Sequence, residues 1–359
     1  MNHQTNLIDL GDLSFHHWKE IVGLALKIQE HPSDFYGALT GKILATLFYE
    51  PSTRTQMSFQ TAMLRLGGQV IGFDNPQNSS VAKGENLKDT ITVVSSYADI
   101  IAMRHPLEGA AKAAALHANC PVINAGDGGH LHPTQTLTDL TTLSKYKGRL
   151  SGLTIGLCGD LKYGRTVHSL IKALCHFPNN EFVLISTEEL SVPSYITDLL
   201  DAHGCHYQKI SALTDAIPEL DVLYMTRVQQ ERFASQEEYL AQKDVYVLDA
   251  EKLSGAKKDL CILHPLPRVD EIQIAVDDDP RACYFKQAQC GVYARMALIL
   301  TMLQRPELCG QPLFSGKESK IHACTNPKCI TNQESYLPRH FVENGDLLVC
   351  EYCDQRILI

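Results

Sequence analysis

The most constraining feature of this sequence is the regular alternation of short apolar runs with amphipathic stretches of helical length. Runs rich in Ile, Val and Leu, such as ILATLF, LTIGL and FVLI, alternate with stretches such as TQMSFQTAMLRLG, where apolar residues recur three and four positions apart. The first pattern is typical of buried strands and the second of helices packed on one face. Because parallel strands need long crossovers, this alternation indicates parallel βαβ units.

We predict an α/β protein with two doubly wound parallel-sheet domains, because the strands are too many for one comfortable sheet. Strands are expected within residues 43–50, 69–73, 98–104, 121–126, 153–159, 181–187, 221–228, 244–249 and 259–265, and helices within 55–67, 86–98, 133–147, 165–177, 193–204 and 283–304. The polar, Gly-containing segment YKGRLSG predicts a boundary between domains at 1–147 and 148–290. A C-terminal helix at about 283–305 completes the first domain, a linker follows at 306–320, and a small domain occupies 321–359.

The amino-acid composition indicates the size of the cores, the location of the protein and the partners that it can bind. The chain has 359 residues and is 44% apolar, which suffices for two cores and an appendage. No apolar run reaches the ~18 residues that a membrane span needs, and the N-terminal segment lacks a signal core, so we expect a cytoplasmic protein. The net charge of -9 argues against broad binding to nucleic acids or anionic membranes, although a local cluster of Arg side chains could still bind a small anion.

The segment EPSTRTQ follows a predicted strand and opens a predicted helix. Ser52, Thr53, Arg54 and Thr55 would present hydroxyls, a guanidinium and free backbone N–H groups together. This combination predicts a phosphate cradle, because helix N-termini attract anions. It lacks the GxxxxGK[ST] pattern of a nucleotide-binding loop, and an ordinary N-cap would account for the local pattern equally well.

Further polar residues follow other predicted strands. MRHP places Arg104 at one strand end, and GGHLHPTQ places His132 and Gln135 on the loop and first helical turn after the next strand. Parallel sheets bind ligands at the carboxyl edge of their strands, which favours a common site over three unrelated capping residues.

In the second domain, GDLKYGRTVHS places Arg165 at a turn, and MTRVQ places Arg227 and Gln229 at a strand end. Two guanidiniums suit a dicarboxylate, because each can hold a carboxylate in a bidentate fork; structural salt bridges are the alternative. The LHPLPR segment would bring backbone carbonyls to the same edge, since Pro265 and Pro267 remove donors and stiffen the turn; a simple rigid turn is the alternative interpretation.

The twelve cysteines fall into two groups. Eight are scattered through the first 309 residues, mostly in apolar segments, as expected for reduced core thiols. The last four, Cys324, Cys329, Cys350 and Cys353, form two close pairs, a spacing typical of tetrahedral zinc bound by four thiolates. We therefore predict a structural zinc ion in a zinc-ribbon-like β domain.

Taken in order, STRTQ, SSVAKGE, MRHP, HPTQTLTDL, GDLKYGRTVHSL, YMTRVQ and LHPLPRVDEI resemble the aspartate carbamoyltransferase catalytic chain over about residues 5–308. The tail, with CTNPKC and VCEYC, resembles the zinc domain of that enzyme's separate regulatory chain. The resemblance implies a fusion of two chains that are normally distinct, without the regulatory chain's nucleotide-binding domain. It implies carbamoyl transfer from carbamoyl phosphate to L-aspartate, with no cofactor in catalysis.

The resemblance also assigns roles to individual residues. The phosphate would be held by Ser52, Thr53, Arg54, Thr55 and Arg104, and the carbamoyl end by His132, Gln135 and the backbone of Leu266 and Pro267. Arg165, Arg227, Gln229 and Lys83 would bind aspartate. Thr55, Arg104 and His132 would stabilise the charge that develops during the reaction.

A homotrimer is the implied assembly, because Lys83 and Ser79 would lie on a loop that reaches the neighbouring subunit's site. Ser79 is preferred to the adjacent Ser80 as the functional hydroxyl. A higher assembly through the zinc domain stays open.

Three alternatives to this function remain. Ornithine could be the acceptor, although STRTQ, LHPLP and TRVQ favour aspartate. The tail could be a nucleic-acid or protein-binding ribbon; its four Lys or Arg and five Asp or Glu from Lys320 onward favour protein. Finally, the chain could be an inactive paralogue that acts through its zinc module.

Overall fold

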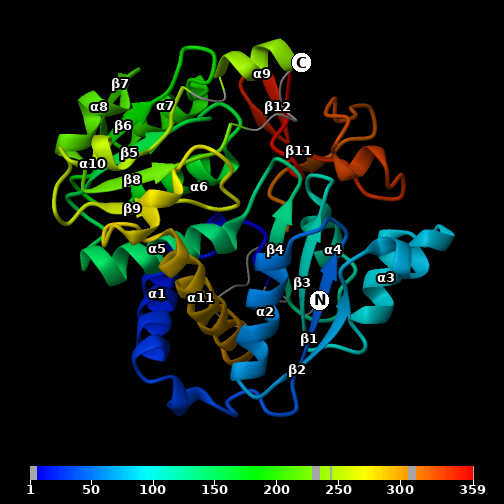
Figure 1. Cartoon of the computed structure of the whole chain (residues 1–359). Coiled ribbons are helices and arrows are strands. Elements are labelled where there is room, and N and C mark those ends of the chain that lie inside the picture. The colour runs from blue at the N-terminus through cyan, green and yellow to red at the C-terminus, as the bar shows by residue number, and fades with distance from the viewer. Residues whose placement is uncertain (1–5, 229–234, 243–244, 306–312, 359) are drawn as a thin grey trace. The chain divides into compact units, whose positions relative to one another are not determined.

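The computed structural model describes residues 6–228, 235–242, 245–305 and 313–358, which fall into two compact units (Figure 1). The first unit comprises Met1–Thr134 and Val292–Ile359, and the second comprises Gln135–Gly291. Two helices, α5 (Pro133–Lys147) and α11 (Tyr284–Gln304), contribute residues to both. No helix in the described ranges is long and apolar enough to cross a membrane.

The first unit contains a parallel sheet in the order β2-β1-β3-β4. Its strands are β1 (Ile43–Phe48), β2 (Gln69–Phe73), β3 (Ile100–His105) and β4 (Val122–Asp127), and its helices include α1 (Phe15–Glu30), α2 (Thr53–Arg65), α3 (Leu87–Val94) and α4 (Ala110–Ala115). The short helical turns are η1 (Leu10–Asp12), η2 (Pro32–Phe35), η3 (Pro76–Asn78) and η4 (Ser80–Lys83). Strands β1, β3 and β4 are buried almost throughout, which explains their continuous apolar sequences, whereas the edge strand β2 is largely exposed.

The second unit contains a five-stranded parallel sheet in the order β7-β6-β5-β8-β9. Its strands are β5 (Thr154–Cys158), β6 (Glu181–Ile185), β7 (His206–Ile210), β8 (Val222–Met225) and β9 (Cys261–Leu263). Its helices include α6 (Arg165–Leu174), α7 (Ser194–Ala202), α8 (Leu213–Ala216), α9 (Gln236–Gln242) and α10 (Ala250–Leu253), with short turns η5 (Ile217–Glu219) and η7 (Ile274–Asp278). In both sheets, the strand order requires crossovers, as the alternating pattern predicts.

The strand predicted at 244–249 is wrong. Within the described part of this segment, Leu248 makes only an isolated parallel bridge to Ile272. Tyr246 and Leu248 are nevertheless buried in the core of the second unit. Their apolar pattern therefore reflects burial rather than membership of the sheet, which periodicity cannot distinguish in so short a run.

The C-terminal tail forms an antiparallel sheet in the order β10-β11-β12-β13. Its elements are β10 (Lys317–Glu318), η9 (Ile330–Asn332), β11 (His340–Asn344), β12 (Leu347–Cys350) and β13 (Arg356–Leu358). Apolar side chains of this tail share one core with α4 and the first sheet. The predicted fold class is confirmed: two parallel-sheet α/β domains and a small C-terminal β domain.

Candidate functional site

The phosphate cradle predicted from EPSTRTQ lies where β1 ends and α2 begins. Ser52 is the N-cap residue of α2 with an irregular backbone, and its side chain makes no capping hydrogen bond. Thr53 and Arg54 are exposed, whereas Thr55 is buried and its carbonyl accepts a hydrogen bond from Ser58 Oγ at 2.8 Å. The first turn of α2 therefore keeps N–H groups for an incoming anion, whose negative charge the helix dipole would favour.

Arg104 brings a second guanidinium to this helix start. β1 and β3 pair in register up to Phe48 and Arg104, and the N–H of Tyr49 donates to the carbonyl of Arg104 at 2.9 Å. Partial desolvation of the Arg54 guanidinium lowers its pKa, and the positive charge of Arg104 lowers it further. Two mutually repelling guanidiniums beside a helix N-terminus form a site that an anion would stabilise.

Arg104 has one acidic neighbour that the sequence did not single out. Its Nε lies 3.4 Å from a carboxylate oxygen of Glu50, a separation that allows charge attraction, but neither of these two atoms has a hydrogen-bond partner. Burial lowers the pKa of Arg104, while the charge of Glu50 opposes that shift. The contact between Arg104 and Glu50 is therefore an ion pair rather than a hydrogen bond. The guanidinium of Arg104 remains able to donate hydrogen bonds to a ligand.

Gly126 lets Arg104 and His132 approach the same point at the end of β4. Gly126 has a φ of 122°, and a Cβ there would lie 2.9 Å from Nη1 of Arg104 and 3.5 Å from Cδ2 of His132. His132 is buried, and its Nδ1 lies 3.4 Å from Oγ1 of Thr134. The structure thus brings together Arg104 and His132, two residues predicted from separate motifs.

The loop that carries Ser79 and Lys83 lies between β2 and α3. The Ser79 hydroxyl donates to the Pro76 carbonyl at 2.7 Å and accepts from the Val81 N–H at 3.3 Å. Lys83 is exposed, as is Ser80. Ser79 therefore shapes the loop in the single chain, while Lys83 extends from it into solvent.

In the second unit, Arg165 and Arg227 follow adjacent strand ends. β5 and β8 pair in register up to Cys158 and Met225, so the segments that follow them start side by side. Arg165 is the first residue of α6, and both arginines are half-buried. This arrangement agrees with the predicted edge of the sheet. Gln229 lies outside the described residues.

The LHPLPR turn after β9 is braced by residues that the sequence reasoning missed. Leu266 has a left-handed backbone with a φ of 54°, and its N–H donates to Nδ1 of buried His264 at 2.8 Å. Nε2 of His264 contacts Glu271 at 2.7 Å. Burial alone would raise the pKa of Glu271, but the hydrogen bonds that its carboxylate accepts from His264 and from backbone N–H groups lower it. The buried His264–Glu271 pair therefore fixes the backbone of Leu266 and Pro267. The only sequence signal for this bracing is the presence of two titratable residues seven positions apart.

Gln135 lies on the first turn of α5 and donates through Nε2 to Asp139 Oδ1 at 2.8 Å. Asp139 is fully buried and also accepts from the hydroxyl of Tyr224 at 3.1 Å and from Nε2 of Gln287 at 2.6 Å. This network orients the amide of Gln135, because its nitrogen is committed to a carboxylate. Its carbonyl oxygen is then the atom suited to accept from an NH2 group.

The four tail cysteines gather into one buried cluster. Their sulfur atoms all lie within 4.8 Å of one another, with Cys324 and Cys353 at 3.5 Å and Cys329 and Cys350 at 3.9 Å. All four are free thiols. Thiolates in this arrangement fit a tetrahedral metal ion.

The tail also docks on the first unit through polar contacts. The N–H of Glu108 donates to the carbonyl of Lys328, and the N–H of Ile330 donates to the carbonyl of Glu108, both at 2.9 Å. Nδ2 of Asn326 donates to the Glu108 carboxylate at 2.6 Å, and Nζ of Lys112 to the carbonyl of Glu351 at 2.6 Å. These contacts hold the tail against the start of α4.

Small residues at this helix permit the close approach. Gly109 has a φ of 81°, and a Cβ there would lie only 2.5 Å from Cβ of Tyr352. The alanines of α4 that follow pack into the shared core. No sequence pattern in either segment alone would have identified this contact.

His130 adds an ionic contact to the docked tail. Its Nδ1 lies 3.1 Å from Asp127, and its Nε2 lies 3.1 Å from Asp354. Burial alone would lower the pKa of His130, but the charge of Asp127 and hydrogen bonds with both carboxylates raise it to about 10. A protonated His130 therefore links the first sheet to the tail.

Three family models match this chain. The carbamoyl-phosphate-binding domain of aspartate/ornithine carbamoyltransferases matches residues 5–145, and the Asp/Orn-binding domain of the same enzymes matches 151–302. The metal-binding domain of the aspartate carbamoyltransferase regulatory chain matches 319–358.

Curated relatives and solved structures agree with these models. The aspartate carbamoyltransferase catalytic subunit of Clostridium perfringens (strain ATCC 13124) is 60% identical over 299 residues, covering 83% of this chain and 97% of its own length. The M. jannaschii catalytic subunit is 48% identical with a TM-score of 0.80, covering 85% of this chain and 99% of its own. The Trypanosoma cruzi enzyme in complex with carbamoyl phosphate and aspartate is 37% identical with a TM-score of 0.77, covering 83% and 96%.

Proposed function

We infer from this chain's membership of the aspartate carbamoyltransferase family that it transfers the carbamoyl group of carbamoyl phosphate to the amino group of L-aspartate. The products are N-carbamoyl-L-aspartate and phosphate, and the reaction is an early step of pyrimidine biosynthesis. One observation carries the assignment to the site: a helix N-terminus without a side-chain cap lies beside two guanidiniums, and among the described residues neither guanidinium has a strong counter-ion.

Phosphate binding is assigned to the first unit. Ser52, Thr53, Arg54 and Thr55 would hold the phosphate with their hydroxyls, guanidinium and N–H groups, and Arg104 would complete the set. As the C–O bond to phosphate breaks, negative charge grows on the leaving group, and both guanidiniums stabilise it.

Attack by the aspartate amine on the carbamoyl carbon places negative charge on the carbonyl oxygen. Thr55, Arg104 and His132 stabilise that oxygen as donors. Gln135 accepts from the carbamoyl NH2 through its carbonyl oxygen, as do the backbone carbonyls of Leu266 and Pro267. The amine gives up a proton as the new C–N bond forms, and the chain needs no covalent nucleophile for this sequence of steps.

Aspartate binding is assigned to the second unit, with Arg165 and Arg227 each holding one carboxylate. Gln229 assists, and Lys83 contributes from the loop of a neighbouring subunit. Two arginines at adjacent strand ends support this role, because a dicarboxylate needs two cationic groups, whereas the cationic side chain of ornithine would be repelled by one of them.

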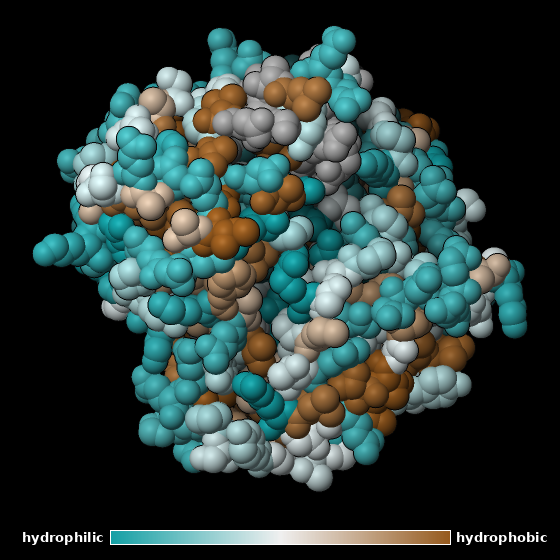
Figure 2. All heavy atoms as spheres, viewed as in Figure 1, coloured by the Kyte–Doolittle hydropathy of each residue, from teal (hydrophilic) through white to brown (hydrophobic). Residues whose placement is uncertain are grey.

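We propose a homotrimer with active sites shared between subunits. The first unit exposes apolar side chains, as Figure 2 shows over the β2 edge of its sheet. Members of this apolar set, each at least 39% exposed, are Tyr36, Met57, Leu64, Ile71, Val93 and Tyr97. Exposed apolar side chains at this edge of the sheet support burial against a neighbouring copy.

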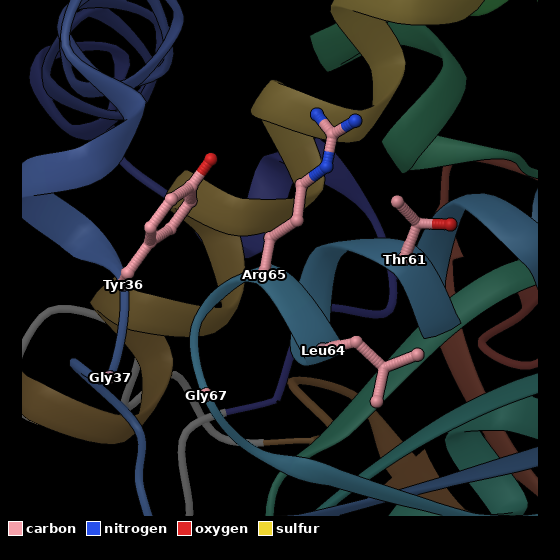
Figure 3. A pocket seen from close by; sticks show the side chains of 6 residues that line it. All are labelled: Tyr36, Gly37, Thr61, Leu64, Arg65 and Gly67. Atoms are coloured by element: carbon pink, nitrogen blue, oxygen red, sulfur yellow. The ribbon is translucent and has the colours of Figure 1, made fainter.

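A hollow of about 400 Å³ accompanies these side chains (Figure 3). Tyr36, Leu64 and Arg65 line it, together with Thr61, Gly37 and Gly67. It lies near the end of α2, whereas the phosphate cradle lies at the start of that 13-residue helix, roughly 15–20 Å away along its axis. The hollow is therefore suited to a neighbour's side chain rather than to the substrate.

The tail metal is proposed to be a structural zinc ion held by Cys324, Cys329, Cys350 and Cys353. With Zn–S bonds of about 2.3 Å, a tetrahedron has sulfur–sulfur edges of about 3.8 Å. The observed 3.5 and 3.9 Å separations fit that size. Zinc bound by all four thiolates would cross-link a domain that has little hydrophobic core of its own.

We propose that the functional domains are 1–147 with the helix at about 283–305 for carbamoyl phosphate, 148–290 for aspartate, a linker at 306–320 and the zinc domain at 321–359. The bounds of the family models support this division. A cytoplasmic location is supported by the free thiols among the described cysteines.

The site assignment is tested by initial rates of carbamoyl aspartate formation in an Arg54→Ala variant. We expect kcat/KM to fall on the order of 10²–10³-fold, as for loss of one strong donor to a developing charge. Arg149→Ala, which removes an exposed guanidinium in the second unit, is the matched control and should retain wild-type rates. Equal rates in both variants would refute the phosphate cradle.

A further inference from the structure

A second group of metal-ligand side chains lies in the second unit. Cys175 follows the last residue of α6, His176 comes next, and His203 follows α7. One ligand atom from each residue lies within 4.8 Å of those of the other two. The two imidazole rings pack edge to face with their centroids 5.0 Å apart. Side chains from two separate helices thus converge at one point.

The position of this cluster favours a cation. Cys175 and His203 are the C-cap residues of α6 and α7, and the dipole of a helix places partial negative charge at its C-terminus. In a parallel sheet, a crossover helix ends near the amino edge of the next strand. The cluster is therefore remote from the carboxyl ends of β5 and β8, after which Arg165 and Arg227 lie.

Hydrogen bonds prepare the side chains for coordination. Nδ1 of His203 lies 3.0 Å from the carbonyl of Leu199, which can only accept, so Nδ1 carries the proton and Nε2 keeps the lone pair that a metal needs. The Cys175 thiol donates to the carbonyl of Lys172 at 3.0 Å and would release its proton on binding a metal.

The donor set selects a class of ion. Two imidazoles and a thiolate suit zinc and similar transition metals, whereas calcium and magnesium prefer oxygen ligands. A further thiol borders the cluster, because Sγ of Cys205 lies 3.9 Å from the carbonyl oxygen of Cys175. We propose that Cys175, His176 and His203 form a second site for a zinc-class transition-metal ion, which clamps the ends of α6 and α7 together. Its role is structural and separate from carbamoyl transfer.

The test uses the full-length chain with metal retained in its tail and Zn²⁺ as the probe in a calorimetric titration. Wild type should bind one further equivalent per chain, and its melting temperature should rise with added Zn²⁺. In His203→Ala, that equivalent should bind at least ~10-fold more weakly, and the rise should disappear. His203 is exposed, so the substitution should leave folding intact.

His206→Ala is the matched control, because His206 is also exposed but is not part of the three-residue cluster. It should behave like wild type. Co²⁺ titration adds a readout for the thiolate: its sulfur-to-metal absorption should appear in wild type and be lost in Cys175→Ser. Absence of the further equivalent in wild type, its survival in His203→Ala or its loss in His206→Ala would overturn the proposal.

Discussion

Replacing Gly126 by Ala should damage catalysis by displacing Arg104. A Cβ at residue 126 would lie 2.9 Å from Nη1 of Arg104, closer than ordinary van der Waals contact, so the guanidinium must move by about half an ångström or more. Displacements approaching 1 Å in a catalytic site can cost ~100-fold in rate. We expect kcat/KM for carbamoyl aspartate formation to fall by about 10–100-fold, or about 1.4–2.7 kcal/mol of transition-state stabilisation.

The Gly41→Ala variant is the control that distinguishes displacement of Arg104 from backbone strain. Gly41 also has a positive φ, of 82°, but apart from its two chain neighbours none of the described residues places an atom within 4 Å of the point that its Cβ would occupy. Both variants should lose about 1–3 kcal/mol of stability, measured by denaturant unfolding, while only Gly126→Ala loses activity at temperatures where both are folded. In an Arg104→Ala background, Gly126→Ala should have little further effect. Activities of the two single variants within about twofold of each other would refute the reasoning.

Three further predictions concern the docked tail. Gly109→Ala should loosen it, because the added Cβ meets Tyr352, and limited proteolysis should then release a C-terminal fragment faster than from wild type. The pKa of His130 is raised above its ordinary value of 6.5 to about 10, so the stability that protonated His130 adds to the fold is full below pH ~6.5 and is lost as the pH rises towards 10. The unfolding free energy should therefore fall more steeply over that pH range in wild type than in His130→Gln. Parallel curves for the two proteins would contradict this. Cys324→Ser should lower the metal content of the chain, measured by elemental analysis, and destabilise the tail while carbamoyl transfer partly survives; complete loss of transfer in an intact trimer would contradict a purely structural metal.

Local sequence patterns predict most of the architecture because buried parallel strands and amphipathic helices have distinct periods. They do not predict the helices α1 and α4, and they fail at two strands. They miss β7 because this edge strand, HYQKI, is largely polar and exposed, so it lacks an apolar run. They predict a strand around Leu248 because burial and sheet membership produce the same short apolar pattern.

Part of the candidate site could likewise be predicted from the sequence, and part could not. Arg104 and His132 could be predicted because Arg104 lies at the end of β3 and His132 follows β4, and strand ends in a parallel sheet share an edge. The contact of Gly126 with Arg104, the ion pair with Glu50 and the bracing of the LHPLPR turn could not, because each depends on side-chain positions set by packing between distant segments. Docking of the tail on α4 depends likewise on contacts across more than 200 residues of sequence.

The measurement that tests the central claim most directly is carbamoyl transfer by the purified full-length chain, supplied with carbamoyl phosphate and either L-aspartate or ornithine. We predict N-carbamoyl-L-aspartate with aspartate, little product with ornithine, and release of one phosphate for each carbamoyl group transferred. Preferential transfer to ornithine would contradict the assignment of Arg165 and Arg227 to a dicarboxylate, and absence of product with both amines would contradict the proposed function itself.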